Sequence, residues 1–277
     1  MFHSPTAHCA LAILGLSLLA APPAQALEVA SQREGVEIRA MDSLPANPGP
    51  AVESDGCSTL DAGPETAGGK AAAAANWAVT GEITQGDLTF VSFVAKSTPG
   101  TSGSCLLEGG NVGIFRGPDL LGLVYAAEGR NRAPGTLQPL HPDGVRIWDG
   151  DYGQMPLADL HLHGDSLLLL RPPADRDSFC DGAVTVPSLY ALPIHQARIL
   201  LLAEGWQPAR PNEQSPSGYV QAMAKTMPEL QDCSGTGFGY CSYAYTKDGG
   251  AALTVTSAGE GMEGSSPAVV DYAARCE

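Results

Sequence analysis

Apolar and polar residues alternate along much of the chain between residues 78 and 173, and this period of two is typical of β-strands. In residues 88–94 apolar side chains occupy both faces, which predicts a strand that is covered on both sides. Short turns at residues 117–119 and 164–165 separate strand-like segments of hairpin length. Residues 78–173 therefore predict an antiparallel β domain, either a sandwich or a barrel.

Helical spacing replaces this alternation in the last third of the chain. Ile194, Ala197 and Leu201 share one face at intervals of three and four residues. Pro193 stands in the first turn, where its missing N–H costs nothing, and Gly205 fits the left-handed position that ends a helix. The spacing thus predicts one amphipathic helix.

Three further apolar residues, Ile199, Leu200 and Leu202, widen the apolar face of this helix. A helix that is apolar around so much of its circumference needs cover on several sides. We therefore expect it to be packed on more than one side.

The residues that follow predict the sheet on which this helix lies. Residues 240–246 and 252–257 alternate on either side of an Asp-Gly-Gly turn, which is a strong hairpin signal. A last strand is expected at residues 268–272 and a second helix at residues 218–227. Residues 180–277 therefore predict a small α+β domain, and the fold class of the whole chain is α+β.

Two segments precede these domains. Residues 1–26 contain no Lys, Arg, Asp or Glu, have an apolar middle, and end in the small-x-small sequence Ala-Gln-Ala, as a secretory signal peptide does. Residues 27–77 are rich in Pro, Gly, Ala and Ser, and we expect a mostly irregular arm that is held at Cys57. The chain is expected to reach the periplasm or the exterior, with no membrane insertion after the signal is removed.

The cysteine pattern favours disulfides. Removal of residues 1–26 takes away Cys9 and leaves an even number, which is typical of an exported chain stapled by disulfides. Proximity across a hairpin favours one pair, while the other two pairs would tie the N-terminal part and close the C-terminal domain, and other connectivities remain open. The expected pairs are Cys233–Cys241, Cys57–Cys105 and Cys180–Cys276. No spacing typical of a zinc site occurs among them.

The charge of the chain narrows the range of partners. The formal net charge is −15, and the 15 basic residues form no cluster. Nucleic acids and anionic lipids are poor partners for such a chain, because phosphate binding needs clustered Lys and Arg. The simplest role of the charge is solubility.

The stretch from residue 186 to residue 208 resembles the front half of a PASTA domain, a small module found outside bacterial serine/threonine kinases and in penicillin-binding proteins. The matching residues, in the spacing of the family, are Val186, Pro187, Leu189, Leu192, Ile194, Ala197, Leu200, Leu201 and Gly205. Ala191 stands where the family has Gly, and Pro193 stands where it has a capping Ser or Thr. The resemblance implies a helix packed on an antiparallel sheet and, because several members bind peptidoglycan fragments, a cell-wall ligand.

One strand carries a candidate metal site. Asp159, His161 and His163 alternate and so fall on one face of residues 157–163, where two imidazoles and a carboxylate could hold Zn²⁺, Cu²⁺ or Fe²⁺. The simpler interpretation is that the intervening leucines face the core and the polar residues face water. We favour the simpler interpretation and expect no metal.

Residues 148–153, WDGDYG, offer two carboxylates and two glycines, as a Ca²⁺ loop does, but they lack the distal Glu of an EF-hand. A turn that ends a strand explains them better. Trp148 and Tyr152 could instead line a platform for a sugar, although packing in the core or at its rim is the default for such residues.

No sequence motif for catalysis is present. The Gly-rich residues 234–239 are not followed by the Lys and Ser or Thr of a phosphate-binding loop, and no GxSxG motif occurs. We therefore expect a non-catalytic binding or interaction module without a cofactor, whose ligand is cell-wall glycopeptide or another protein. The alternatives are a metal-dependent enzyme centred on His161 and His163, and a secreted hydrolase inhibitor.

Overall fold

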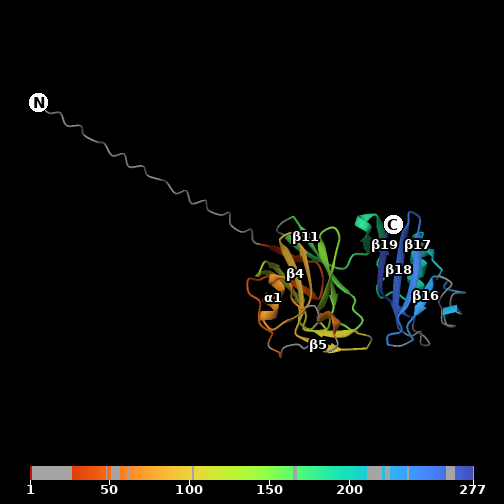
Figure 1. The fold of residues 1–277 in the computed structure, drawn as a ribbon, viewed down its shortest axis with the longest axis horizontal. Coiled ribbons are helices and arrows are strands. Elements are labelled where there is room, and N and C mark those ends of the chain that lie inside the picture. Colours follow the sequence, from red (N-terminus) through yellow and green to blue (C-terminus); the bar gives the residue numbers. More distant parts are fainter. Residues whose placement is uncertain are drawn as a thin grey trace.

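The computed structural model describes residues 1, 27–47, 49–50, 57–60, 63–101, 103–164, 167–210, 220–221, 225–235, 237–259 and 266–276. Within these ranges the chain is mostly β-sheet with two α-helices, which is compatible with the expected α+β class. Figure 1 shows two lobes side by side, an N-terminal lobe of residues 27–171 and a C-terminal lobe of residues 176–276. Neither described helix is long and apolar enough to cross a membrane.

Two five-stranded sheets build the N-terminal lobe. The first sheet has the order β1 (Glu28–Ser31), β12 (Leu167–Arg171), β11 (Pro156–His163), β10 (Gly144–Asp149) and β9 (Pro134–Pro139). The second sheet has the order β2 (Val36–Ala40), β8 (Asp119–Ala126), β7 (Asn111–Arg116), β4 (Leu88–Val94) and β3 (Ala78–Gln85). Neighbouring strands are antiparallel except β1 and β12, which are parallel.

The inner faces of the two sheets form one core, because alternate residues of each strand point inward. Phe90 and Ile114 from the second sheet meet Ile147, Leu160 and other apolar residues from the first, all fully buried. The strands and hairpins that alternation predicts at residues 88–94, 111–125 and 157–170 are thus present.

The outer face of the second sheet is covered by helix α1 (Ala67–Ala74). The Thr66 side chain accepts a hydrogen bond from the Gly69 N–H and so caps this helix. A Cβ at Gly68 would lie 2.7 Å from the Phe115 ring, so only glycine allows the helix to approach the sheet this closely. Phe93 is buried beneath the helix.

The described residues between 27 and 77 contain more regular structure than the predicted irregular arm. Strand β1 pairs with β12, β2 pairs with β8, and a 3-10 turn, η1 (Ser58–Leu60), precedes α1. These short strands are stabilised by partners that lie far away in the sequence, so local composition does not reveal them. The predicted signal peptide lies outside the described residues except for Met1.

A sheet with one helix on it forms the C-terminal lobe. Its order is β15 (Gln207–Pro208), β17 (Cys241–Lys247), β18 (Ala251–Ala258) and β19 (Ala268–Arg275), with β16 (Leu230–Cys233) also paired to β17. Helix α2 (Ile194–Ala203) follows the hairpin β13 (Arg176–Phe179), η2 (Cys180–Gly182) and β14 (Val184–Pro187). Of the predicted helix at residues 218–227, residues 220–221 are helical and residues 225–227 are not, while residues 218–219 and 222–224 lie outside the described residues.

Helix α2 is covered on one side only by the described residues, which corrects the expectation of cover on several sides. Ile194, Ala197 and Leu201 are buried against the sheet. Ile199, Leu200 and Leu202 are 63%, 40% and 38% exposed. The helix ends as predicted, with Gly205 at φ 85°.

Three disulfides close the chain at the expected positions. Cys57–Cys105 links the segment before α1 to β6 (Cys105–Glu108), the partner of β5 (Lys96–Pro99) in a small hairpin. Cys180–Cys276 joins the two ends of the C-terminal lobe, and Cys233–Cys241 joins directly opposed residues of β16 and β17. Such closures restrict the unfolded chain and fit folding in an oxidising compartment.

Candidate functional site

A buried ion network joins the two lobes at the outer face of the first sheet. Arg146 and Asp159 are directly opposed on β10 and β11, with Nε–Oδ1 and Nη2–Oδ2 distances of 2.8 and 2.9 Å. Their side chains are 5% and 0% exposed. Asp177 of the C-terminal lobe places Oδ1 2.6 Å from Arg146 Nη1, and the Tyr272 hydroxyl donates a hydrogen bond to Asp177 Oδ2.

The charges in this network compensate one another. Burial disfavours the Arg146 cation, but the hydrogen bonds and negative charges of Asp159 and Asp177 outweigh that cost and raise the pKa of Arg146 above its usual value. Arg146 therefore stays charged, and its two carboxylate partners come from different lobes.

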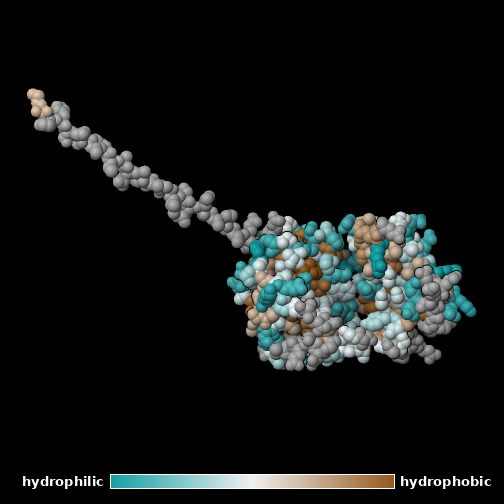
Figure 2. All heavy atoms as spheres, viewed as in Figure 1, coloured by the Kyte–Doolittle hydropathy of each residue, from teal (hydrophilic) through white to brown (hydrophobic). Residues whose placement is uncertain are grey.

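Aromatic rings continue the contact between the lobes. Trp148 of β10 meets Tyr190 edge to face, with ring centroids 5.1 Å apart, and Tyr190 lies 4.5 Å from the Tyr272 ring. Trp148 is thus held by the C-terminal lobe on one side while another part of its surface remains accessible. A groove between the lobes is visible in Figure 2.

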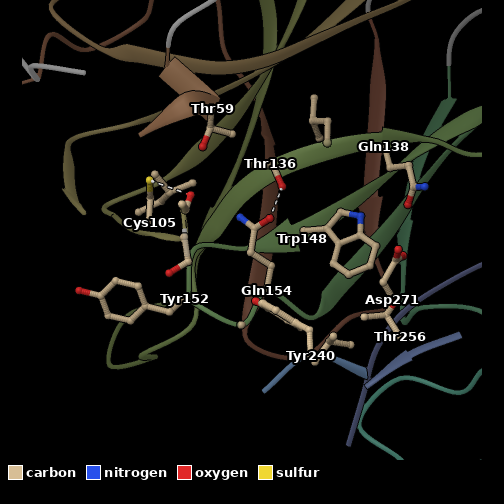
Figure 3. Close-up of a pocket in the computed structure, with 16 residues that line it drawn as sticks. Thr59, Cys105, Thr136, Gln138, Trp148, Tyr152, Gln154, Tyr240, Thr256 and Asp271 are labelled. Carbon is tan, nitrogen blue, oxygen red and sulfur yellow. Dashed lines mark hydrogen bonds between the residues drawn. The ribbon is translucent and has the colours of Figure 1, made fainter. Parts of the chain in front are cut away.

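A cavity of about 540 Å³ opens beside Trp148 and is lined by both lobes. This volume lies in the range of small-molecule binding sites. Figure 3 shows the main side chains around it. The N-terminal lobe supplies Thr136, Gln138, Trp148, Tyr152 and Gln154, and the C-terminal lobe supplies Tyr240, Thr256 and Asp271.

Irregularities in the strands coincide with the cavity. The pairing of β10 shifts register at Trp148 against both of its neighbours, β9 and β11. The pairing of β18 with β19 shifts between Thr256 and Ser257, so that Val270 is the extra residue before Asp271. Such bulges bend a strand and re-aim its side chains, and here both lobes have one at the wall of the cavity.

Uncharged polar groups dominate the N-terminal wall. Thr136 and Gln138 alternate on β9, and the Thr136 hydroxyl donates to Gln154 Oε1 over 3.1 Å. That bond fixes the Gln154 amide, as Figure 3 shows. The ring of Tyr152 lies against the backbone at Gly100, where a Cβ would be 2.6 Å away. These amides and hydroxyls offer both donors and acceptors to a ligand.

Asp271 is the one charged residue among the described residues that line this cavity. Burial raises the pKa of its carboxyl, although the backbone N–H of Tyr272 opposes that effect and the side chain keeps contact with solvent. Within the described parts of the chain no basic side chain forms an ion pair with it. Asp271 is nevertheless an exposed residue, so its position in the cavity wall, and not desolvation, makes its carboxylate a candidate for ligand binding.

The predicted metal-site residues do not converge. Asp159 is bound by Arg146 and also accepts the Ala174 N–H, so its oxygens are already used. The His161 and His163 rings lie 6.3 Å apart on the same strand, and burial lowers the pKa of His161. No group of three or more candidate ligands occurs within the described residues. The expectation that the polar face of this strand is wet is wrong for Asp159, which is fully buried.

The loop at residues 148–153 contributes to the cavity rather than to a cation site. Asp149 is buried and paired with Arg132 at 2.6 Å. Trp148 and Tyr152, the aromatic pair considered for a sugar platform, both line the cavity. Tyr240 and Asp271 were not predicted from the sequence, because only the packing of the lobes brings them to this wall. Gln138 was not predicted either, because the pairing of β9 with β10 brings it there; the alternation of Thr136 and Gln138 was the one local signal.

Comparison with protein-family models, with curated proteins and with solved structures finds no match to this chain.

Proposed function

We propose that this chain is an exported, non-catalytic binding protein of the bacterial periplasm and that the cavity between its lobes receives cell-wall glycopeptide. The observation that carries the proposal is the composition of the cavity wall. Trp148, Tyr152 and Tyr240 offer apolar ring surfaces, while Gln138 and Gln154 offer amides. Pyranose rings present apolar C–H faces and hydroxyl edges, so this combination suits them.

The C-terminal lobe adds support from its resemblance to a PASTA domain. Helix α2 lies on an antiparallel sheet, as in that family. Ala191, which stands at the usual glycine of the family, has φ 63°, a backbone conformation that favours glycine. Peptidoglycan binding by several members makes a glycopeptide the first ligand to test.

Binding rather than cleavage is proposed because glycoside hydrolysis normally uses two carboxyl groups. Among the described residues of the cavity wall Asp271 is the one carboxylate. Export is supported by the three disulfides, which need an oxidising environment to persist.

The test is retention of the purified, disulfide-bonded protein on peptidoglycan sacculi. We expect the native protein to sediment with sacculi, and Trp148→Ala to weaken retention about tenfold or more, because a central aromatic anchor is removed. Tyr125→Ala is the matched control, since Tyr125 is an aromatic residue on the outer face of the second sheet. Equal retention of Trp148→Ala and native protein would contradict the proposal, and capture of a hydrolase in place of sacculi would favour the inhibitor alternative.

A further inference from the structure

Among the described residues that line the cavity between the lobes, the charge is negative only. The described lining contains no Lys and no Arg, and Asp271 is its one charged side chain. The protein as a whole carries a formal charge of −15. A cleft with low-dielectric walls concentrates such a field, so the cavity favours cations over anions.

The position of Asp271 places this negative charge beside Trp148. Asp271 follows the bulge at Val270, and Figure 3 shows its carboxylate beside the Trp148 indole. Tyr190, which touches Trp148, has a pKa raised by burial and then by the charges of Asp177 and Asp271. Arg146 compensates Asp177, whereas no described side chain compensates Asp271.

We infer that the cavity selects saccharides that carry a free ammonium group, which Asp271 binds, over the same saccharides in N-acetylated form. This inference rests on the proposed function, because it assumes that a sugar ring lies against Trp148. It identifies Asp271 as the residue that determines the class of ligand.

The other wall residues favour a primary ammonium group. An ammonium N–H can donate to the Asp271 carboxylate in a charge-assisted hydrogen bond, which is stronger than a neutral one. The faces of Trp148 and Tyr240 attract a cation further. A quaternary ammonium would neutralise the charge of Asp271 but has no N–H to donate to it. An N-acetyl group brings no charge and would leave Asp271 without a counter-ion.

The experiment is calorimetric titration of the full, disulfide-bonded protein with two tetrasaccharides in moderate salt. One is β-1,4-linked glucosamine with free amino groups, and the other is its fully N-acetylated counterpart. We expect the free-amine tetrasaccharide to bind about tenfold more tightly, which corresponds to about 1.4 kcal/mol. Asp271→Asn should reduce this preference to about twofold or less, because the counter-ion is lost while the shape is kept.

Asp248→Asn is the matched control for net charge, since Asp248 is an exposed carboxylate in the β17–β18 turn of the same lobe. It should keep the full preference. Equal affinity for the two tetrasaccharides would overturn the inference and leave the proposed function standing. A preference that survives in Asp271→Asn would also overturn it. Failure of both tetrasaccharides to bind would overturn the inference, while retention on sacculi decides the proposed function separately.

Discussion

Ala191 holds a left-handed backbone conformation, with φ 63°, in the segment that leads into α2. This conformation costs an L-residue about 1–2 kcal/mol, whereas glycine adopts it freely. Ala191→Gly removes that strain, but the greater conformational freedom of glycine stabilises the unfolded chain by about 0.4–1 kcal/mol. We expect a net gain of about 0.5–1 kcal/mol in the free energy of unfolding, measured by urea denaturation.

Ala183→Gly provides the control for this prediction. Ala183 is also exposed, but it has φ −68° and gains nothing from the freedom of glycine. We expect this change to lower the free energy of unfolding. Destabilisation by both changes would show that Ala191 is not strained.

Ionisation of the Asp271 carboxyl is expected to make the stability of the folded protein depend on pH. Because burial raises its pKa in the folded state, the folded protein holds the proton more strongly than the unfolded chain does. Its stabilising contribution is present below the unfolded pKa and is lost as the pH rises through the folded pKa. Asp271 is an exposed residue, so solvent screens much of this effect. We therefore expect Asp271→Asn to raise the melting temperature only slightly at pH 7 and to leave it nearly unchanged at pH 3. A lower melting temperature at pH 7 would contradict the assigned direction.

At the scale of elements, α2 is amphipathic in the structure although its sequence is apolar almost all round. Leu201 is fully buried and Ile199 is 63% exposed. Leu201→Ala should lower the free energy of unfolding by about 2–5 kcal/mol, because it leaves a cavity in the core. Ile199→Ala should change it by about 0.5 kcal/mol or less. Comparable losses in the two variants, measured by denaturant unfolding, would mean that a further element covers Ile199.

The elements that sequence predicted are those with a strong local period. Helix α2 is predictable from the spacing of Ile194, Ala197 and Leu201 and from Gly205 at its end. Strand β4 and the hairpins are predictable from the alternation of apolar and polar residues. Strands β1 and β2 were missed because they are short and owe their pairing to partners more than 80 residues away in the chain. The exposure of Ile199 could not be predicted either, since it depends on how many layers pack on the helix.

The candidate site was predictable only in part, for the same reason. Trp148 and Tyr152 are recognisable as a candidate aromatic pair because they lie close together in the sequence. Asp271 approaches them through the contact of the two lobes, which no local pattern encodes. Asp159 was expected to face water and is instead buried and paired with Arg146.

At the scale of the whole molecule, the ion network around Arg146 couples the lobes. Arg146→Met would leave Asp159 and Asp177 buried without a cation, which costs about 3–5 kcal/mol. Arg116→Met removes an exposed pair with Asp87 and should cost about 1 kcal/mol or less. Denaturant unfolding of both variants checks this difference, and equal losses would contradict a special role for the buried network.

The most direct test of the account uses the three tryptophans of the chain as reporters in a nitrogen-15 NMR spectrum. Trp148 lines the cavity, whereas Trp206 is buried in the C-terminal core and the Trp77 indole donates to Pro45 O. On titration with soluble peptidoglycan fragments, the Trp148 indole signal should shift and saturate while those of Trp77 and Trp206 stay in place. Saturable binding that leaves the Trp148 signal unchanged would contradict the assignment of the cavity as the binding site.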